Sequence, residues 1–271
     1  MKPILPAWLL GEFFGTFLLV FFGCGAGAVA TLLGPPVGVF PVAVAWGLGV
    51  MVAVYSTGAL SGAHLNPAVT GALAVWRGFP RRRAAGYMAA QLAGAFVAAA
   101  VLQVMLAGSL AKFEMAHHLT RGAPGSEATA MIFGEYFPNP GGRPLDPATR
   151  ELLSPGAAFF CEVTGTAVLL LVIFAVTDER NPGRPRELAP VVIGITVTLL
   201  ISILGPLTMA CFNPARDFGP RLWSAVGGWG SVPFTANGWG WLTVYIMAPL
   251  LGGILGGGVW YLLLGPRQGK T

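Results

Sequence analysis

Residues 61–70 read SGAHLNPAVT, and a second Asn-Pro-Ala triplet stands in CFNPARDFGP at 211–220. Asn followed by Pro is a typical helix start, because Asn caps the first turn and Pro lacks only an N–H that is not needed there. A single such triplet is usually an ordinary cap. Here both copies precede an apolar stretch of about ten residues, too short to cross a bilayer as a helix. The pair therefore predicts two half-length helices, each preceded by an irregular segment.

The composition is that of a membrane protein. Of the 271 residues, 55% are hydrophobic and only 10% are charged, whereas a soluble domain carries roughly 25% charged residues. The charges lie between apolar runs that can cross a hydrocarbon core of about 30 Å as helices of about 20 residues. Six such runs are present, at 4–32, 37–60, 84–106, 156–176, 188–204 and 242–264. We therefore expect an all-α membrane protein with six transmembrane helices and two re-entrant half-helices.

The formal net charge of +5 reflects the ends of these runs rather than a nucleic-acid interface. The basic residues form no single stripe with interleaved aromatic residues. With six spans, one membrane face would hold Lys2, Arg81–Arg83, Arg180, Arg184, Arg186, Arg267 and Lys270. The positive-inside rule makes that face cytoplasmic. We expect a multi-pass protein of the plasma (cytoplasmic or inner) membrane with both termini in the cytoplasm, surrounded by lipid and without a nucleic-acid partner.

The chain contains an internal repeat. The pattern Glu-x-x-Gly-Thr occurs twice, 150 positions apart, and the two Asn-Pro-Ala triplets are 147 positions apart. Two similar apolar segments, each centred on a glycine, share the offset of 147. The landmarks are Glu12, Gly47 and Asn66 in one half and Glu162, Gly194 and Asn213 in the other. Three landmarks in the same order indicate a duplicated chain.

The repeat predicts how the two halves are oriented. We expect a single channel domain, 1–271, with halves at 4–107 and 156–264 and a long extracellular connecting loop at 108–155. Each half has three spans, an odd number, so the second half starts on the opposite membrane face. This is the inverted-repeat arrangement, and it brings the two half-helices in from opposite faces to meet near the midplane.

Irregular backbone at membrane depth is tolerated only where protein or a water-filled cavity satisfies its polar groups. The segments before the half-helices should therefore line a pore, with their carbonyls as a row of acceptors. We assign this role to Gly62, Ala63, His64, Leu65, Met209, Cys211 and Phe212. Asn66 and Asn213 would place side-chain N–H donors at the centre. The two helix N-termini, each with roughly half a positive charge, would repel cations there, including hydronium.

The two Asn-Pro-Ala motifs and the Glu-x-x-Gly-Thr starts resemble the aquaporin family, the major intrinsic proteins, over nearly the whole chain. The motif residues are Asn66, Pro67, Ala68, Asn213, Pro214 and Ala215. The resemblance implies one pore per chain and a homotetramer. It also implies that Glu12 and Glu162 brace the re-entrant segments by accepting backbone hydrogen bonds. The alternative for an intramembrane carboxylate is a proton relay.

Four residues resemble the glycerol-conducting branch, the aquaglyceroporins. Asp217 follows Arg216, where water-only members tend to carry a small residue, and Arg221 could pair with Asp217 on one helix face. Pro249 and Leu250 resemble the last span of glycerol-type members, and the long connecting loop resembles that of glycerol facilitators. The resemblance implies a passive channel for glycerol and other small neutral solutes, with water, that excludes ions and protons.

The resemblance also locates the selectivity constriction, which spacing to the motifs places at Trp46, Ile201, Ala210 and Arg216. Arg216 would donate to solute hydroxyls and oppose cations, and its costly burial indicates a purpose. Trp46 would offer an apolar wall to a carbon backbone. The commonest glycerol-facilitator pattern has glycine and phenylalanine where Ile201 and Ala210 stand. Some plant nodulin-type intrinsic proteins resemble the set found here.

Other functions compete with a glycerol channel. The same fold could be a water-selective aquaporin, or a channel for urea, lactic acid, hydrogen peroxide or a metalloid acid. A coupled transporter would need a carboxylate for its coupling ion, and the two pore-lining segments contain none. No Ser-His-Asp, HExxH or phosphate-loop pattern indicates an enzyme, and we expect no cofactor.

Histidine and cysteine give weaker signals. His117 and His118 are adjacent residues of the long loop, a pattern more typical of surface histidines than of a metal site, so we expect no metal. The three cysteines form no disulfide framework. Cys211 lies two residues before Asn213 and predicts a channel that mercury inhibits.

Overall fold

A computed structural model describes residues 5–34 and 38–266. Six helical spans in these residues are long and apolar enough to cross a membrane, which confirms the prediction. Five of them are α1 (Ala7–Leu32), α2 (Val39–Ser61), α4 (Arg81–Ala116), α7 (Pro155–Thr177) and α8 (Ala189–Thr208), the last preceded by η1 (Arg186–Leu188). The sixth runs through α11 (Gly240–Leu242), η3 (Thr243–Met247), α12 (Ala248–Val259) and η4 (Trp260–Leu264).

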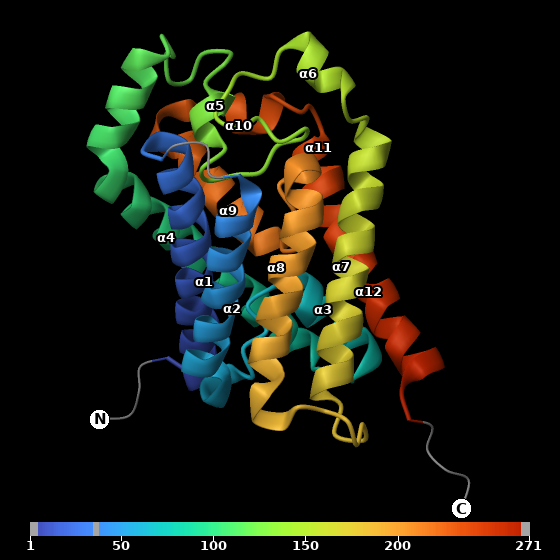
Figure 1. The fold of residues 1–271 in the computed structure, drawn as a ribbon. Helices are drawn as coiled ribbons and strands as arrows, with labels where there is room; N and C mark the ends of the chain where they lie inside the picture. Colours follow the sequence, from blue (N-terminus) through green and yellow to red (C-terminus); the bar gives the residue numbers. More distant parts are fainter. Residues whose placement is uncertain (1–4, 35–37, 267–271) are drawn as a thin grey trace, which may run out of the picture.

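The two half-helices are also present. They are α3 (Pro67–Trp76) and α9 (Pro214–Ser224), and each begins with the proline of its Asn-Pro-Ala motif. Figure 1 shows both in the middle of the bundle, α3 in the lower half of the view and α9 in the upper half. After α9 the chain forms two short elements, η2 (Ala225–Trp229) and α10 (Val232–Thr235), before the last span.

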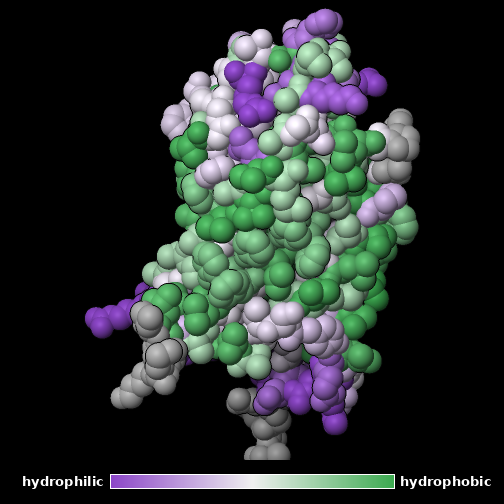
Figure 2. Space-filling model, turned by 90° about the vertical axis from the view of Figure 1, so that its left-hand side faces the viewer, coloured by the Kyte–Doolittle hydropathy of each residue, from purple (hydrophilic) through white to green (hydrophobic). Residues whose placement is uncertain are grey.

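The membrane faces can be followed in the figures. The start of α1, the end of η4 and the turn between α7 and α8 lie at one end of the bundle, and the connection from α4 to α7 covers the other end (Figure 1). On the face that Figure 2 shows, a hydrophobic band crosses the middle of the molecule, and hydrophilic residues gather at both ends. Lys2, Arg267, Lys270 and the first residues of the two predicted runs at 4 and 37 lie outside the described residues.

The long connection is shorter than the sequence suggested. Helix α4 continues to Ala116, so that 108–116, expected as loop, is helical. Ala, Leu, Lys, Glu and Met favour a helix in this segment in spite of its charges. The rest of the connection contains α5 (Glu127–Ala130) and α6 (Pro147–Glu151). Its residues 127–138 are all buried, so this loop enters the protein instead of lying on its surface.

The two halves pack in the same way. Helix α1 packs against α2 and α4, as α7 packs against α8 and α12, and α2 meets α8 between the halves. At that crossing a Cβ added to Gly47 would lie 2.4 Å from the Gly194 carbonyl oxygen, and one added to Gly194 would lie 2.5 Å from that of Gly47. Only glycine permits this approach, because any side chain would collide with the facing backbone.

Candidate transport pore

The pore begins with two irregular segments of matching backbone conformation. Helix α2 ends at left-handed Gly62 and α8 ends at left-handed Met209, the equivalent position of the second half. Two further left-handed residues follow in each segment: Ala63 (φ 48°) and Leu65 (φ 53°), and Ala210 (φ 62°) and Phe212 (φ 52°). Residues with side chains rarely adopt this conformation, and where they do the surrounding structure must hold them in place.

Two buried glutamates form hydrogen bonds with these segments. Glu12 accepts hydrogen bonds from the backbone N–H groups of His64 (2.9 Å) and Leu65 (2.8 Å). Glu162 does the same for Cys211 (3.0 Å) and Phe212 (2.9 Å). Each carboxylate also accepts one side-chain hydrogen bond, from Gln91 Nε2 to Glu12 and from Thr208 Oγ1 to Glu162, both 2.6 Å long. This geometry is what a brace for the re-entrant segments requires.

The asparagines of the two motifs cap their own helices and also join the two halves. Asn66 Oδ1 accepts from Ala68 N (2.8 Å), and Asn213 Oδ1 accepts from Ala215 N (3.0 Å). Asn66 Nδ2 donates to the Phe212 carbonyl and Asn213 Nδ2 donates to the Leu65 carbonyl, each at 2.8 Å. A primary amide has two N–H donors, and in the described chain one of them is used in this way by each asparagine.

A cavity of about 260 Å³ runs beside these segments. Its polar wall is formed by both re-entrant segments and both asparagines, and its apolar wall by side chains such as Val50, Leu169 and Val197. Arg216 borders one part of it, and Arg77, which ends the half-helix α3, borders another. One polar side and one apolar side suit a solute that has hydroxyl groups on a carbon chain.

The predicted pore residues lie at the cavity with few exceptions. All four constriction residues border it, and so do six of the seven residues whose carbonyls we assigned to the pore. Met209 is not among the lining residues of the described chain, and its Sδ instead accepts from Tyr136 N (3.3 Å). The Leu65 and Phe212 carbonyls already accept hydrogen bonds from the asparagines, which the sequence did not indicate.

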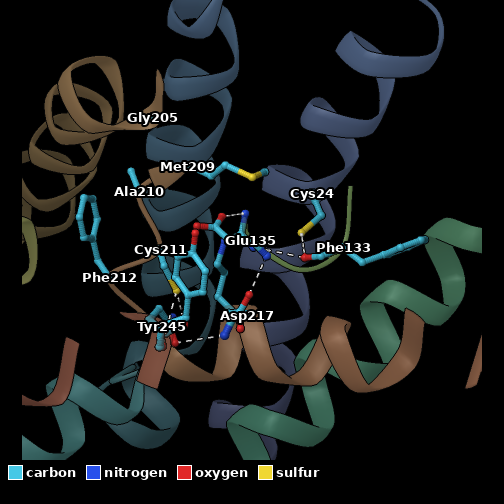
Figure 3. Close-up of polar contacts among 12 residues, drawn as sticks. Cys24, Phe133, Glu135, Gly205, Met209, Ala210, Cys211, Phe212, Asp217 and Tyr245 are labelled. Atoms are coloured by element: carbon cyan, nitrogen blue, oxygen red, sulfur yellow. Dashed lines mark hydrogen bonds and ion pairs between the residues drawn. The ribbon is translucent and has the colours of Figure 1, made fainter. Parts of the chain in front are cut away.

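Arg216 is held by three groups at the constriction. Its Nη1 donates to the Phe133 carbonyl (3.3 Å), and its Cζ lies 4.4 Å from the centre of the Trp46 ring. Its Nη2 forms an ion pair with the carboxylate of Glu135. Figure 3 draws Glu135 and Phe133, both from the buried part of the loop between α4 and α7. Neither residue was predicted from the sequence; the available signal was a glutamate within the apolar stretch MIFGEYF at 131–137.

Asp217 and Arg221 pair as their spacing predicted, but away from the cavity. Arg221 Nε and Nη2 donate to the two Asp217 carboxylate oxygens at 2.8 and 2.7 Å, and both side chains are buried. Asp217 Oδ1 also accepts from the backbone N–H of Glu135 (2.7 Å), and Arg221 donates to the Glu135 carbonyl. The pair therefore fixes the loop that carries Glu135. Burial raises the pKa of the Glu135 carboxyl, and the adjacent Arg216 favours its charged form.

The two glycerol-type residues of the last span and the two loop histidines lie outside the pore. Pro249 is buried in the first turn of α12, and Leu250 is next to Gly71 of α3; neither borders the cavity in the described chain. His117 and His118 are exposed at the end of α4. No group of three or more potential metal ligands was found among residues 5–34 and 38–266. Cys211 borders the cavity, and its Sγ lies 3.3 Å from the Asn213 carbonyl oxygen.

Comparisons with known proteins agree with this architecture. A family model described as "Major intrinsic protein" matches residues 6–261. The chain is 42% identical to a glycerol uptake facilitator protein of Pseudomonas aeruginosa, over 97% of this chain and 90% of the relative. It is 40% identical to a propanediol uptake facilitator of Citrobacter freundii, over 98% and 94%. The X-ray structure of the aquaglyceroporin from Plasmodium falciparum matches with a TM-score of 0.80 at 28% identity, over 95% and 96%. The chain belongs to the major intrinsic protein family.

Proposed function

We propose that this chain is a passive membrane channel for glycerol and other small neutral solutes, with water, and not an enzyme. The observation that carries the proposal is the pairing of Arg216 with Trp46 at a cavity that also contains both motif asparagines. The guanidinium can donate to hydroxyl groups while the ring contacts the carbon chain. The relatives named glycerol uptake facilitators support the choice of solute.

Ion exclusion follows from the same geometry. Arg216 turns N–H donors toward the pore, and the N-termini of α3 and α9 present positive dipole ends to it, an arrangement that opposes cations. The asparagine amides and the backbone carbonyls can replace the water partners of a neutral solute but only part of the hydration shell of an ion. Among the described residues, those that border the cavity include no carboxylate that could bind a coupling cation, which favours a channel over a coupled transporter.

The proposed assembly and orientation rest on the family and on charge. We propose a homotetramer in the plasma (cytoplasmic or inner) membrane, surrounded by lipid, with both termini and the turn between α7 and α8 in the cytoplasm. Arg180, Arg184 and Arg186 lie in or beside that turn, as the positive-inside rule requires. Glu12 and Glu162 are proposed to brace the pore segments rather than to relay protons, because each already accepts two backbone N–H bonds.

The constriction also bears on the range of solutes. Ile201 and Ala210 make two sides of the constriction apolar, which favours a solute with an apolar end as well as hydroxyl groups. Two relatives are named propanediol uptake facilitators, so a diol that carries a methyl group is the second candidate. If polyols do not pass in the same assay, the alternatives are a water-selective pore or a pore for urea, lactic acid, hydrogen peroxide or a metalloid acid.

The test is stopped-flow light scattering on proteoliposomes. After a glycerol gradient, vesicles with the channel should shrink and re-swell faster than empty vesicles. Ile201→Trp should block both phases, because Ile201 borders the cavity. Ile203→Trp is the matched control, since Ile203 lies on the same helix with 68% of its surface exposed. Fast shrinkage without glycerol entry would contradict the proposal and indicate a water-selective channel.

A further inference from the structure

Glu135 reaches the constriction from the loop between α4 and α7, yet it is not among the described residues that border the cavity. Its side chain is fully buried, and its carboxylate contacts the Arg216 guanidinium. The carboxylate oxygens have no hydrogen-bond partner of ordinary geometry elsewhere in the described chain. The ion pair with Arg216 is therefore the interaction that keeps a charge at this buried position.

Charge balance shows what Glu135 contributes. Asp217 engages Arg221 through both of its carboxylate oxygens, so that these two charges already compensate each other. Arg216 forms its ion pair with Glu135 alone among the described residues. A buried charge without a partner is strongly unfavourable, whereas a paired one is tolerated. With Glu135 in place, the charges of these two ion pairs, Arg216 with Glu135 and Arg221 with Asp217, sum to zero.

The same contact also fixes the position of the guanidinium. Two of its nitrogens point toward the loop, one to Phe133 and one to Glu135, while its face lies over the Trp46 ring. A guanidinium has five N–H donors, so the two interactions with the loop leave others for a passing solute. Glu135 thereby acts on the solute through Arg216, without contacting it.

We infer that Glu135 is a positioning residue that determines specificity: its carboxylate holds Arg216 against the loop and cancels its charge, so that the constriction offers hydrogen-bond donors without net positive charge. The inference rests on the proposed transport function. Conduction requires a solute to bind weakly enough to leave. An uncompensated guanidinium in a site removed from water would hold a hydroxyl group more tightly, because such bonds strengthen with charge and low dielectric.

The experiment compares two substitutions of Glu135 in reconstituted vesicles. Glu135→Gln removes the charge with little change of shape, and Glu135→Asp keeps the charge on a shorter side chain. Glycerol and water permeabilities per channel are measured by stopped flow at several temperatures. We expect Glu135→Gln to lower both permeabilities about fivefold and to raise their activation energies, because solute leaves the constriction more slowly. Glu135→Asp should recover part of the loss.

Glu127 provides a matched control in the same loop. It is also buried, at 4% exposure, but its carboxylate accepts from the backbone N–H groups of Gly125 (2.8 Å) and Leu145 (3.0 Å) instead of pairing with an arginine of the pore. Glu127→Gln therefore removes a comparable charge while leaving the constriction unchanged. Its permeability per channel and its activation energies should match those of the parent.

The outcomes separate the inference from the proposed function. Permeabilities and activation energies for Glu135→Gln equal to those of the parent, or equal losses for Glu135→Gln and Glu127→Gln, would overturn the role of Glu135. If the parent conducts water but not glycerol, the proposed solute is wrong and Glu135 is judged on water permeability alone. A parent that conducts neither would overturn both. The amount of folded channel in each vesicle preparation is measured, so that poor folding is not counted as slow conduction.

Discussion

The side-chain amide of Asn66 lies 2.8 Å from the carbonyl oxygen of Phe212, in the opposite half of the chain, and Asn213 makes the equivalent bond to Leu65. Each asparagine therefore does two things at once: its oxygen caps its own half-helix, and its nitrogen holds the segment that precedes the other one. This reciprocal contact joins the two halves at the centre of the pore. It makes the geometry of each motif depend on the other.

Replacing one asparagine should therefore weaken both halves. We expect Asn66→Ala and Asn213→Ala each to destabilise the protein by about 1–2 kcal/mol from the lost cap, with a further contribution from the carbonyl left without its donor. The measurement is the thermal unfolding midpoint in detergent, with the aggregation onset as a check. Asn181→Ala is the control, because Asn181 lies in the turn after α7 and its Nδ2 donates to the Ala175 carbonyl in the last turn of that helix, away from the two motifs. Equal midpoints for all three variants would contradict the expectation.

The brace can be tested against the proton-relay alternative at Glu162. Glu162→Gln keeps one acceptor oxygen but turns an N–H₂ group toward a backbone N–H, so one of the two bonds to Cys211 and Phe212 is lost. We expect destabilisation of about 1–3 kcal/mol and slower solute flux. A proton relay predicts instead a proton flux in the parent that the substitution abolishes. A pH-sensitive dye inside the vesicles distinguishes the two, and we expect no proton flux in either protein.

Mercury inhibition should depend on Cys211, because this residue borders the cavity. We expect mercuric chloride to slow water and glycerol flux in the parent and to have little effect on Cys211→Ser. Cys24→Ser is the control: Cys24 is buried and is not among the described residues that border the cavity, so this variant should remain sensitive. Full inhibition of Cys211→Ser would show that mercury acts elsewhere.

The crossing of α2 and α8 should tolerate no side chain. Gly47→Leu is expected to prevent assembly of the bundle, because even a Cβ would lie 2.0 Å from Thr198 Oγ1 and 2.4 Å from the Gly194 carbonyl oxygen. Gly58→Ala is the matched control on the same helix, since an added Cβ there meets nothing within 4 Å. It should leave stability unchanged or raise it by up to about 1 kcal/mol. The yield of monodisperse protein after size-exclusion chromatography measures both effects.

The features that the sequence predicted are those that depend on local chemistry or on the repeat. Apolar runs of sufficient length predicted the six spans, and Asn-Pro predicted the starts of α3 and α9. The offset of 147 predicted which segments are equivalent, and the structure extends this equivalence to the left-handed residues Ala63 and Ala210. The end of α4 was placed too early because the apolar run that predicted the span ends at 106, whereas helix propensity carries the helix to Ala116.

The features that only the tertiary structure decided are contacts between segments far apart in the chain. The sequence by itself determined the membrane class, the duplicated halves and the motif residues, because helix caps, span length and repetition are visible along the chain. It could not show that Glu135 meets Arg216, or that each asparagine bonds to the other half. The partner of a buried charge or amide is set by how a loop folds back into the bundle, and that path depends on the packing of the whole protein.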